Sequence, residues 1–159
     1  MKTVYTTDNI HIVSYKPEYA IYFDRFNKAW LEEYFVVEPI DKYVLENPEE
    51  AILKQGGKIL FAEHEGRIVG TVALKLAGPG IYELTKMAVD KDLRGLGAGK
   101  ILCKAAIEEA KRLKAHTLIL YSQRQLENAI AIYRKMGFNE LPLEAGVYKR
   151  ADIKMGMSF

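Results

Sequence analysis

A glycine at every second position marks the segment whose residue types could do chemistry. Gly95, Gly97 and Gly99 follow an apolar run typical of a strand, and a helical pattern begins directly after them. Glycines let consecutive backbone N–H groups turn toward one concavity, and a helix start adds unsatisfied donors with a partial positive charge. This combination predicts a site for a phosphate or pyrophosphate group.

Two common phosphate-binding motifs fail on this segment. A P-loop requires glycine, four residues and then Gly-Lys-Ser/Thr, yet Arg94 occupies the first position and Ile101 the last. A dinucleotide-binding fingerprint, Gly-x-Gly-x-x-Gly, fails because its third glycine would fall on Lys100 or Leu102. A third pattern, Gln/Arg-x-x-Gly-x-Gly/Ala, matches the run Arg94-Gly95-Leu96-Gly97-Ala98-Gly99.

With this run, the sequence resembles the GNAT superfamily of acyl-CoA-dependent N-acyltransferases. Residues 83–89 are similar to the family's strand before the loop, and residues 129–138, which end in Tyr-Arg-Lys-Met-Gly-Phe, are similar to its second motif. The resemblance implies an N-acetyltransferase that uses acetyl-CoA and no metal, built as a single domain over residues 1–159. It also implies an α/β (α+β) fold with a mixed, mostly antiparallel sheet, flanking helices and one parallel β-α-β crossover.

The resemblance implies two contact regions for the coenzyme. Backbone amides of the loop would bind its pyrophosphate, and the pantetheine arm would pair with the end of the preceding strand. A β-bulge there would open a V-shaped slot, and a free N–H would stabilise the oxyanion. Lys135 could simply be a solvated residue at the end of its helix, where a positive charge suits the helix dipole. The resemblance implies instead that it reaches the phosphates of the coenzyme. The expected cofactor-binding residues are Met87, Ala88, Val89, Arg94, Gly95, Leu96, Gly97, Ala98, Gly99, Lys100 and Lys135.

Two side chains are candidates for proton transfer. Tyr133 lies on the apolar face of its helix, where most tyrosines only pack, but the resemblance implies that it protonates the leaving thiolate. A phenol with a pKa of about 10 can donate to a thiolate whose conjugate acid has a pKa of about 8.5. Taken by itself, a glutamate at position 83 would be a solvated residue of the strand. The resemblance implies that Glu83 is a general base, because an amine must lose a proton before it attacks.

The resemblance places the acceptor pocket beside the helix and loop that precede the sheet. This region carries an aromatic stripe over residues 19–34, and its far end supplies the expected acceptor-binding residues Trp30, Tyr34 and Phe35. Nearby glutamates suit a cationic amine. We therefore expect a small-molecule amine as the substrate. A protein-lysine or N-terminal acetyltransferase and a catalytically silent acyl-CoA-binding regulatory module are the alternatives.

The elements that must position these residues follow from hydrophobic periodicity and turn signals. Pro39 ends the aromatic helix, and Asn47 opens a short second helix. The strand–helix–strand unit over residues 81–121 predicts one right-handed crossover with a parallel pair, and hairpins supply most of the other pairings. The expected strands are residues 10–13, 58–63, 68–76, 81–89, 117–121, 138–141 and 151–157.

Composition excludes several classes of function. Lysine and arginine total 23 and aspartate and glutamate total 21, so the net charge of +2 gives no support for broad binding to nucleic acid or to a membrane. The three histidines show no ligand spacing, the single cysteine excludes an intramolecular disulfide, and no apolar run is long enough to span a membrane. We expect a cytoplasmic enzyme, and the paired closing strands are compatible with a homodimer.

Overall fold

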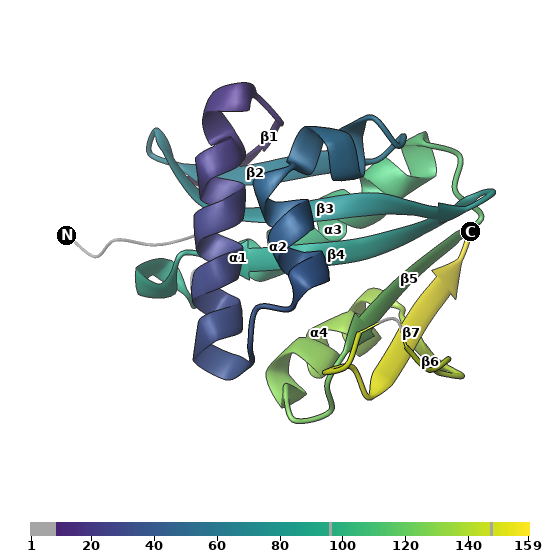
Figure 1. Cartoon of the computed structure of the whole chain (residues 1–159). Coiled ribbons are helices and arrows are strands. Elements are labelled where there is room, and N and C mark those ends of the chain that lie inside the picture. Colours follow the sequence, from purple (N-terminus) through teal and green to yellow (C-terminus); the bar gives the residue numbers. More distant parts are fainter. Residues whose placement is uncertain (1–8, 96, 147) are drawn as a thin grey trace.

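The structure, a computed structural model, describes residues 9–95, 97–146 and 148–159. Figure 1 shows one twisted sheet with helices packed on both of its faces. The described residues form a seven-stranded sheet in the order β1-β2-β3-β4-β5-β7-β6, and β4 and β5 are its parallel neighbours. The strands are β1 (Ile10–Ser14), β2 (Lys58–His64), β3 (Arg67–Gly78), β4 (Ile81–Val89), β5 (Thr117–Ser122), β6 (Asn139–Leu141) and β7 (Ile153–Ser158). The α-helices are α1 (Ala20–Tyr34), α2 (Pro39–Glu46), α3 (Ala98–Arg112) and α4 (Glu127–Met136).

The two faces of the sheet hold separate hydrophobic clusters. Along β2, Ile59 and Phe61 pack in the cluster with α1 and α2, whereas Leu60 and Ala62 pack in the cluster with α3 and α4. This alternation follows from the two-residue period of a strand. The predicted fold, a mixed and mostly antiparallel sheet flanked by helices with one parallel crossover, is confirmed.

β4 stays beside β5 for only part of its length. Parallel pairing joins residues 81–83 to residues 117–119, whereas the antiparallel pairing of β4 with β3 continues to Val89. The register of β3 and β4 shifts between Thr71 and Ala73, because β4 carries one additional residue there, and Lys86 has a left-handed φ of 54°. This is a β-bulge, and beyond it β4 and β5 separate into the V-shaped slot that the resemblance implied.

The second helix differs from the prediction. α2 begins at Pro39, the residue that was expected to end the aromatic helix, and the segment after Asn47 forms a π-helical turn, Glu49–Leu53. Pro39 suits the first turn of α2 because its missing N–H is not needed there. Glu38 and Asp41 form a capping box through both side chains. An acidic residue in the place of the usual Ser or Thr hides this start in the sequence.

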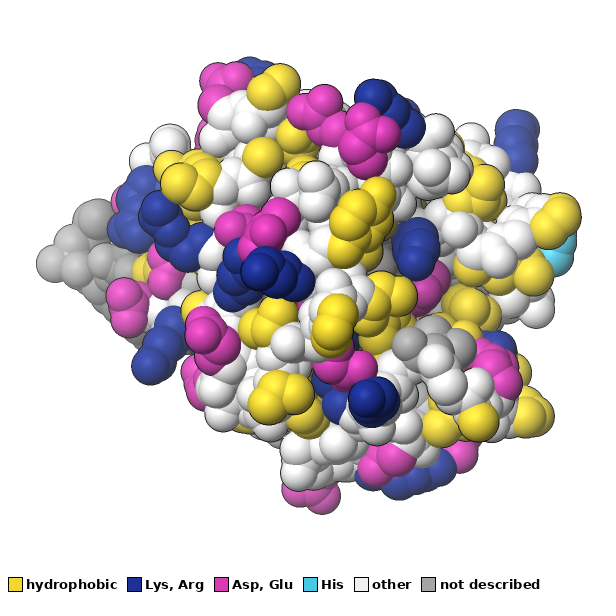
Figure 2. All heavy atoms as spheres, viewed as in Figure 1, with side chains coloured by type: hydrophobic (Ala, Val, Ile, Leu, Met, Phe, Trp, Pro, Cys, Tyr) yellow, Lys and Arg dark blue, Asp and Glu magenta, His cyan; other side chains and the backbone are white. Residues whose placement is uncertain are grey.

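Charge is finely mixed on one face of the protein. Figure 2 shows positive and negative side chains interspersed over the face that carries α1 and α2, so this face presents no field of one sign. Within the described residues, no helix is long and apolar enough to cross a membrane. Nor do the described residues form a group of three or more His, Cys, Asp or Glu side chains that could hold a metal ion.

The packing of α3 against the sheet determines where the glycine loop lies. Leu102 of α3 is fully buried over Gly70 of β3. A Cβ on Gly70 would lie 2.9 Å from Leu102 Cδ1, so the glycine lets the helix approach the sheet closely. The N-terminus of α3 is thereby fixed beside the end of β4.

We expect Leu102→Ala to lower the free energy of unfolding by about 2–5 kcal/mol, because it leaves a cavity between α3 and β3. Lys104→Ala, at an exposed position of the same helix, should change it by less than about 0.5 kcal/mol. Urea denaturation of both variants measures the difference. Equal stabilities would contradict the packing of α3.

Candidate active site

A cleft lies where β4 and β5 separate. It is lined by α1, β4, β5, α4 and the segment before β7, and it holds about 760 Å³ of empty space, including its open mouth. The predicted residues Glu83 and Met87 of β4, Tyr133 of α4, and Trp30 and Phe35 at the end of α1 all line it. The fold thus brings the two candidates for proton transfer into one cleft with part of the expected acceptor site.

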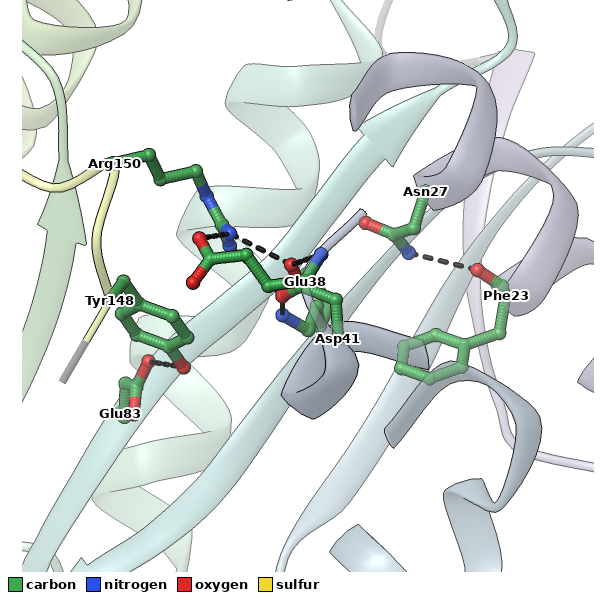
Figure 3. Close-up of polar contacts among 8 residues, drawn as sticks. Phe23, Asn27, Glu38, Asp41, Glu83, Tyr148 and Arg150 are labelled. Atoms are coloured by element: carbon green, nitrogen blue, oxygen red, sulfur yellow. Dashed lines mark hydrogen bonds and ion pairs between the residues drawn. The ribbon is translucent and has the colours of Figure 1, made fainter. Parts of the chain in front are cut away.

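Glu83 lies at the point where the pairing of β4 with β5 ends, and its side chain is 5% exposed. Its Oε2 accepts a hydrogen bond of 2.8 Å from the Tyr148 hydroxyl (Figure 3). Burial raises the pKa of Glu83, and the hydrogen bond from Tyr148 and the positive charges of Lys75 and Lys86 oppose that rise only in part. Glu83 is therefore a buried carboxylate rather than a solvated strand residue, with a pKa displaced toward the range useful to a general base.

Tyr133 lies one turn before Gly137, whose left-handed φ of 110° ends α4. Its ring packs edge-on against Phe138, with 5.9 Å between the ring centroids. Burial raises the pKa of the Tyr133 hydroxyl, so the group stays protonated near neutral pH. Among the described residues, no hydrogen bond engages this hydroxyl. It therefore remains available to a ligand in the cleft.

Two glycines of the loop have left-handed backbone conformations. Gly95 and Gly97 have left-handed φ values of 96° and 85°, and Gly97 caps the N-terminus of α3 without a side chain. The first N–H groups of α3 are thus left to solvent or a ligand. Lys100 is exposed in the first turn of α3. Leu96 lies outside the described residues.

Gly99 differs from its neighbours because nothing within the described chain requires a glycine there. Its φ is not left-handed, and a Cβ added to it would meet no atom within 4 Å. Ala98, directly before it, is buried under the sheet. A missing side chain at an open helix start leaves room for another molecule to approach the backbone.

Neither Arg94 nor Lys135 is among the residues that line the cleft. Arg94 Nη1 donates to both carboxylate oxygens of Glu33, at 3.1 and 2.9 Å, and its guanidinium lies 5.9 Å from the centre of the Tyr34 ring. This charge is therefore directed toward α1 and already paired. Lys135 is exposed in the last turn of α4 and does not line the cleft.

The end of β4 supplies a backbone edge beside the cleft. Ala88 is buried and pairs with Thr71 of β3, and Val89 pairs with Gly70. Met87 lines the cleft. Within the described part of the chain, no strand pairs with the opposite edge of β4 after Glu83. An extended ligand could occupy that edge as an additional strand does.

Two of the three expected acceptor residues reach the cleft. Trp30 and Phe35 line it, with their ring centroids 5.4 Å apart. Tyr34 is 44% exposed and packs against the outer side of the same aromatic group, 5.3 Å from Trp30. It is absent from the cleft lining because the last turn of α1 directs it elsewhere.

An ion cluster beside the cleft was not predicted from the sequence. Asp41 is fully buried, and its Oδ1 accepts hydrogen bonds from Lys86 Nζ at 2.5 Å and Arg150 Nη2 at 3.0 Å (Figure 3). Arg150 Nη1 donates to Asp41 Oδ2 and to Glu38 Oε2, both at 2.8 Å. We call Glu38, Asp41, Lys86 and Arg150 the Asp41 cluster. In the sequence, the sign of this cluster is Lys86, a lysine within an otherwise apolar strand. Its partners could not be identified because they are far apart in the sequence.

Burial and charge pairing oppose each other within the Asp41 cluster. Burial favours a higher pKa for Asp41, but Arg150 and Lys86 outweigh it and hold the pKa of this carboxyl below its usual range. Burial lowers the pKa of Lys86, and Asp41 opposes that shift. Two carboxylates therefore balance two cations, and among the described residues no salt bridge reaches Glu83.

Residues 19–138 match the acetyltransferase (GNAT) family. A mycothiol acetyltransferase of Saccharomonospora viridis is 31% identical over 105 residues, which are 61% of this chain and 34% of that protein, so the match spans about a third of that relative. An uncharacterized N-acetyltransferase of Schizosaccharomyces pombe is 29% identical over 117 residues, 69% of this chain and 72% of that protein.

Solved structures share the whole fold. A GNAT-family acetyltransferase of Staphylococcus aureus Mu50 has a TM-score of 0.81 and 25% identity, covering 94% of this chain and 98% of that one. A putative acetyltransferase of Salmonella typhimurium, solved with its cofactor acetyl-CoA, has a TM-score of 0.75 and 20% identity, covering 94% of each chain. The family match over most of the sequence, together with the glycine loop and the splayed sheet, shows that the chain belongs to the GNAT family of acetyltransferases.

Proposed function

We propose that the protein transfers an acetyl group from acetyl-CoA directly to a primary amine of a small molecule. The observation that carries this proposal is that Glu83 of β4 and Tyr133 of α4 line one cleft. Direct transfer needs one group that takes a proton from the amine and another that gives a proton to the departing sulfur. Acetyl-CoA, when bound, supplies the acetyl group as a reactive thioester.

The residues of the loop and of β4 fit acetyl-CoA. The left-handed backbone at Gly95 and Gly97, with the N-terminus of α3, suits the pyrophosphate, and exposed Lys100 adds a positive charge. The open edge of β4 suits the amide groups of the pantetheine arm. N–H groups on this edge, beyond the bulge at Lys86, would stabilise negative charge on the acetyl oxygen.

Glu83 and Tyr133 divide the proton transfers according to their surroundings. Glu83 is buried with a raised pKa, so its carboxylate has the basicity to accept a proton from an amine that enters as an ammonium ion. Burial raises the pKa of Tyr133, so its hydroxyl keeps its proton near neutral pH and can donate it through a hydrogen bond to the sulfur as negative charge develops there. These opposite tasks require no change of role during turnover.

Charge and ring chemistry of the cleft favour a cationic acceptor. The cations of the Asp41 cluster are already paired with carboxylates, so they offer no unoccupied partner to an anionic substrate. Glu83 carries the carboxylate that an ammonium group can approach. Trp30, Phe35 and Tyr121 add aromatic surface, which attracts cations and the apolar body of a small amine.

A panel assay tests this function. Purified protein is mixed with acetyl-CoA and primary amines of varied size and charge, and release of free thiol is followed. We expect turnover with small cationic amines. Turnover confined to lysine-containing peptides or protein N-termini would replace the proposed acceptor with a polypeptide. Binding of acetyl-CoA without thiol release for any amine would indicate a silent module, and no binding in calorimetry would exclude the coenzyme.

Gly99→Ala tests the coenzyme site separately from the fold. We expect acetyl-CoA affinity to fall about tenfold or more, about 1.4 kcal/mol, because the added methyl group occupies space that the coenzyme needs. The melting temperature should not fall, since the methyl group meets no atom within 4 Å. Gly78→Ala is the control, because its Cβ would lie 3.8 Å from Ile81 Cδ1 and far from the loop. Unchanged affinity in Gly99→Ala, measured by calorimetry, would contradict the placement of the coenzyme.

Tyr133→Phe tests the acid. We expect turnover to fall by about 10²–10⁴-fold while acetyl-CoA affinity and the unfolding midpoint are retained, because the hydroxyl makes no hydrogen bond among the described residues. Tyr82→Phe removes a hydroxyl from another buried tyrosine that does not line the cleft, and should leave turnover unchanged. Steady-state kinetics of both variants provide the comparison. Full turnover in Tyr133→Phe would remove the acid role.

A further inference from the structure

We propose that Tyr148 is a positioning residue for Glu83, holding the carboxylate in the orientation and charge state in which it can accept a proton from the amine. This inference rests on the proposed function. Tyr148 lies in the segment between β6 and β7, and its hydroxyl donates to Glu83 Oε2 at 2.8 Å (Figure 3). A hydrogen bond to a carboxylate from a neutral hydroxyl stabilises the ionised form and fixes which oxygen is left for another donor.

The ring of Tyr148 is held by several neighbours. Tyr121 of β5 packs edge-on against it, with 5.6 Å between the centroids. The Arg150 guanidinium lies 4.9 Å from its centroid and Lys86 Nζ lies 5.3 Å away. These contacts come from β4, β5 and the segment before β7. The hydroxyl is therefore aimed at Glu83 by packing and not only by the hydrogen bond itself.

The Asp41 cluster anchors this segment across the cleft. Arg150, two residues after Tyr148, reaches α2, where it binds Asp41 through two nitrogens and Glu38 through one. Paired hydrogen bonds from a guanidinium to a carboxylate define direction as well as distance. Figure 3 shows Tyr148 between Arg150 and Glu83. The ion cluster and the base are therefore linked through one tyrosine.

The charged and titratable groups that act on Glu83 come from several elements. Lys75 of β3 and Lys86 of β4 favour its ionised form by charge, and Tyr148 and, more weakly, Thr85 of β4 favour it by hydrogen bonding. Tyr121 of β5 and Tyr133 of α4 line the same cleft, and the charge of Glu83 acts on Tyr121. Burial opposes ionisation. Removing the Tyr148 hydroxyl takes away one interaction that counteracts the effect of burial, so the pKa of Glu83 rises. As the pH falls, the carboxylate then becomes protonated at a higher pH than in the wild type.

Carbon-13 NMR of protein labelled at the glutamate carboxyls measures this directly. Glu83→Gln removes one titrating resonance and so identifies Glu83. In Tyr148→Phe, which keeps the ring, we expect that resonance to titrate about one pH unit higher than in the wild type. Tyr15→Phe is the matched control: its hydroxyl donates to Glu49 at 3.0 Å, outside the cleft, so the Glu83 titration should not move.

The outcomes separate this inference from the proposed function, because the titration needs neither acetyl-CoA nor turnover. A Glu83 resonance that titrates at the same pH in Tyr148→Phe and wild type would overturn the role of Tyr148, whatever the activity. With an accepted amine, the acid limb of kcat/KM should move up by the same amount in Tyr148→Phe, with activity recovered at higher pH. A loss equal at every pH would reduce Tyr148 to a structural residue.

Discussion

β4 pairs with β5 over three residues and then bends away at Lys86, and the rest of the site depends on that bend. A left-handed backbone at a residue other than glycine costs about 1–2 kcal/mol, so the surroundings must hold it. The Lys86 ammonium is buried against Asp41 at 2.5 Å, which ties the bulge to α2. The open edge of β4 and the cleft beside it follow from this one fixed distortion.

The two halves of the sheet are held together at both ends of the slot. At the closed end, β4 and β5 pair directly, and Glu83 lies at the last of these pairs. Across the open region, Arg150 connects the segment before β7 to α2 through Asp41 and Glu38. The candidate base and acid therefore stand on a strand and a helix whose separation is fixed, which suits direct transfer between two bound substrates.

Features that lie within one continuous segment could be predicted from the sequence, whereas features that depend on contacts between distant segments could not. The glycine loop, the strand before it and the helix with Tyr133 were recognisable because each is a continuous motif. The Asp41 cluster was not, because Asp41 and Arg150 are 109 positions apart and neither interrupts a motif. α2 was not predicted, because its start carries Glu38 and Asp41 as the capping pair in place of the usual Ser or Thr. Arg94 fitted the motif, yet its side chain turned to Glu33, a partner that only the packing of α1 could reveal.

The most direct test of the account is a crystal structure with coenzyme A. We expect the pyrophosphate against the N–H groups at Gly97 and Gly99, the pantetheine arm along the open edge of β4, and the sulfur within hydrogen-bond reach of Tyr133 Oη. A coenzyme bound away from both the open edge of β4 and the N-terminus of α3 would contradict this placement.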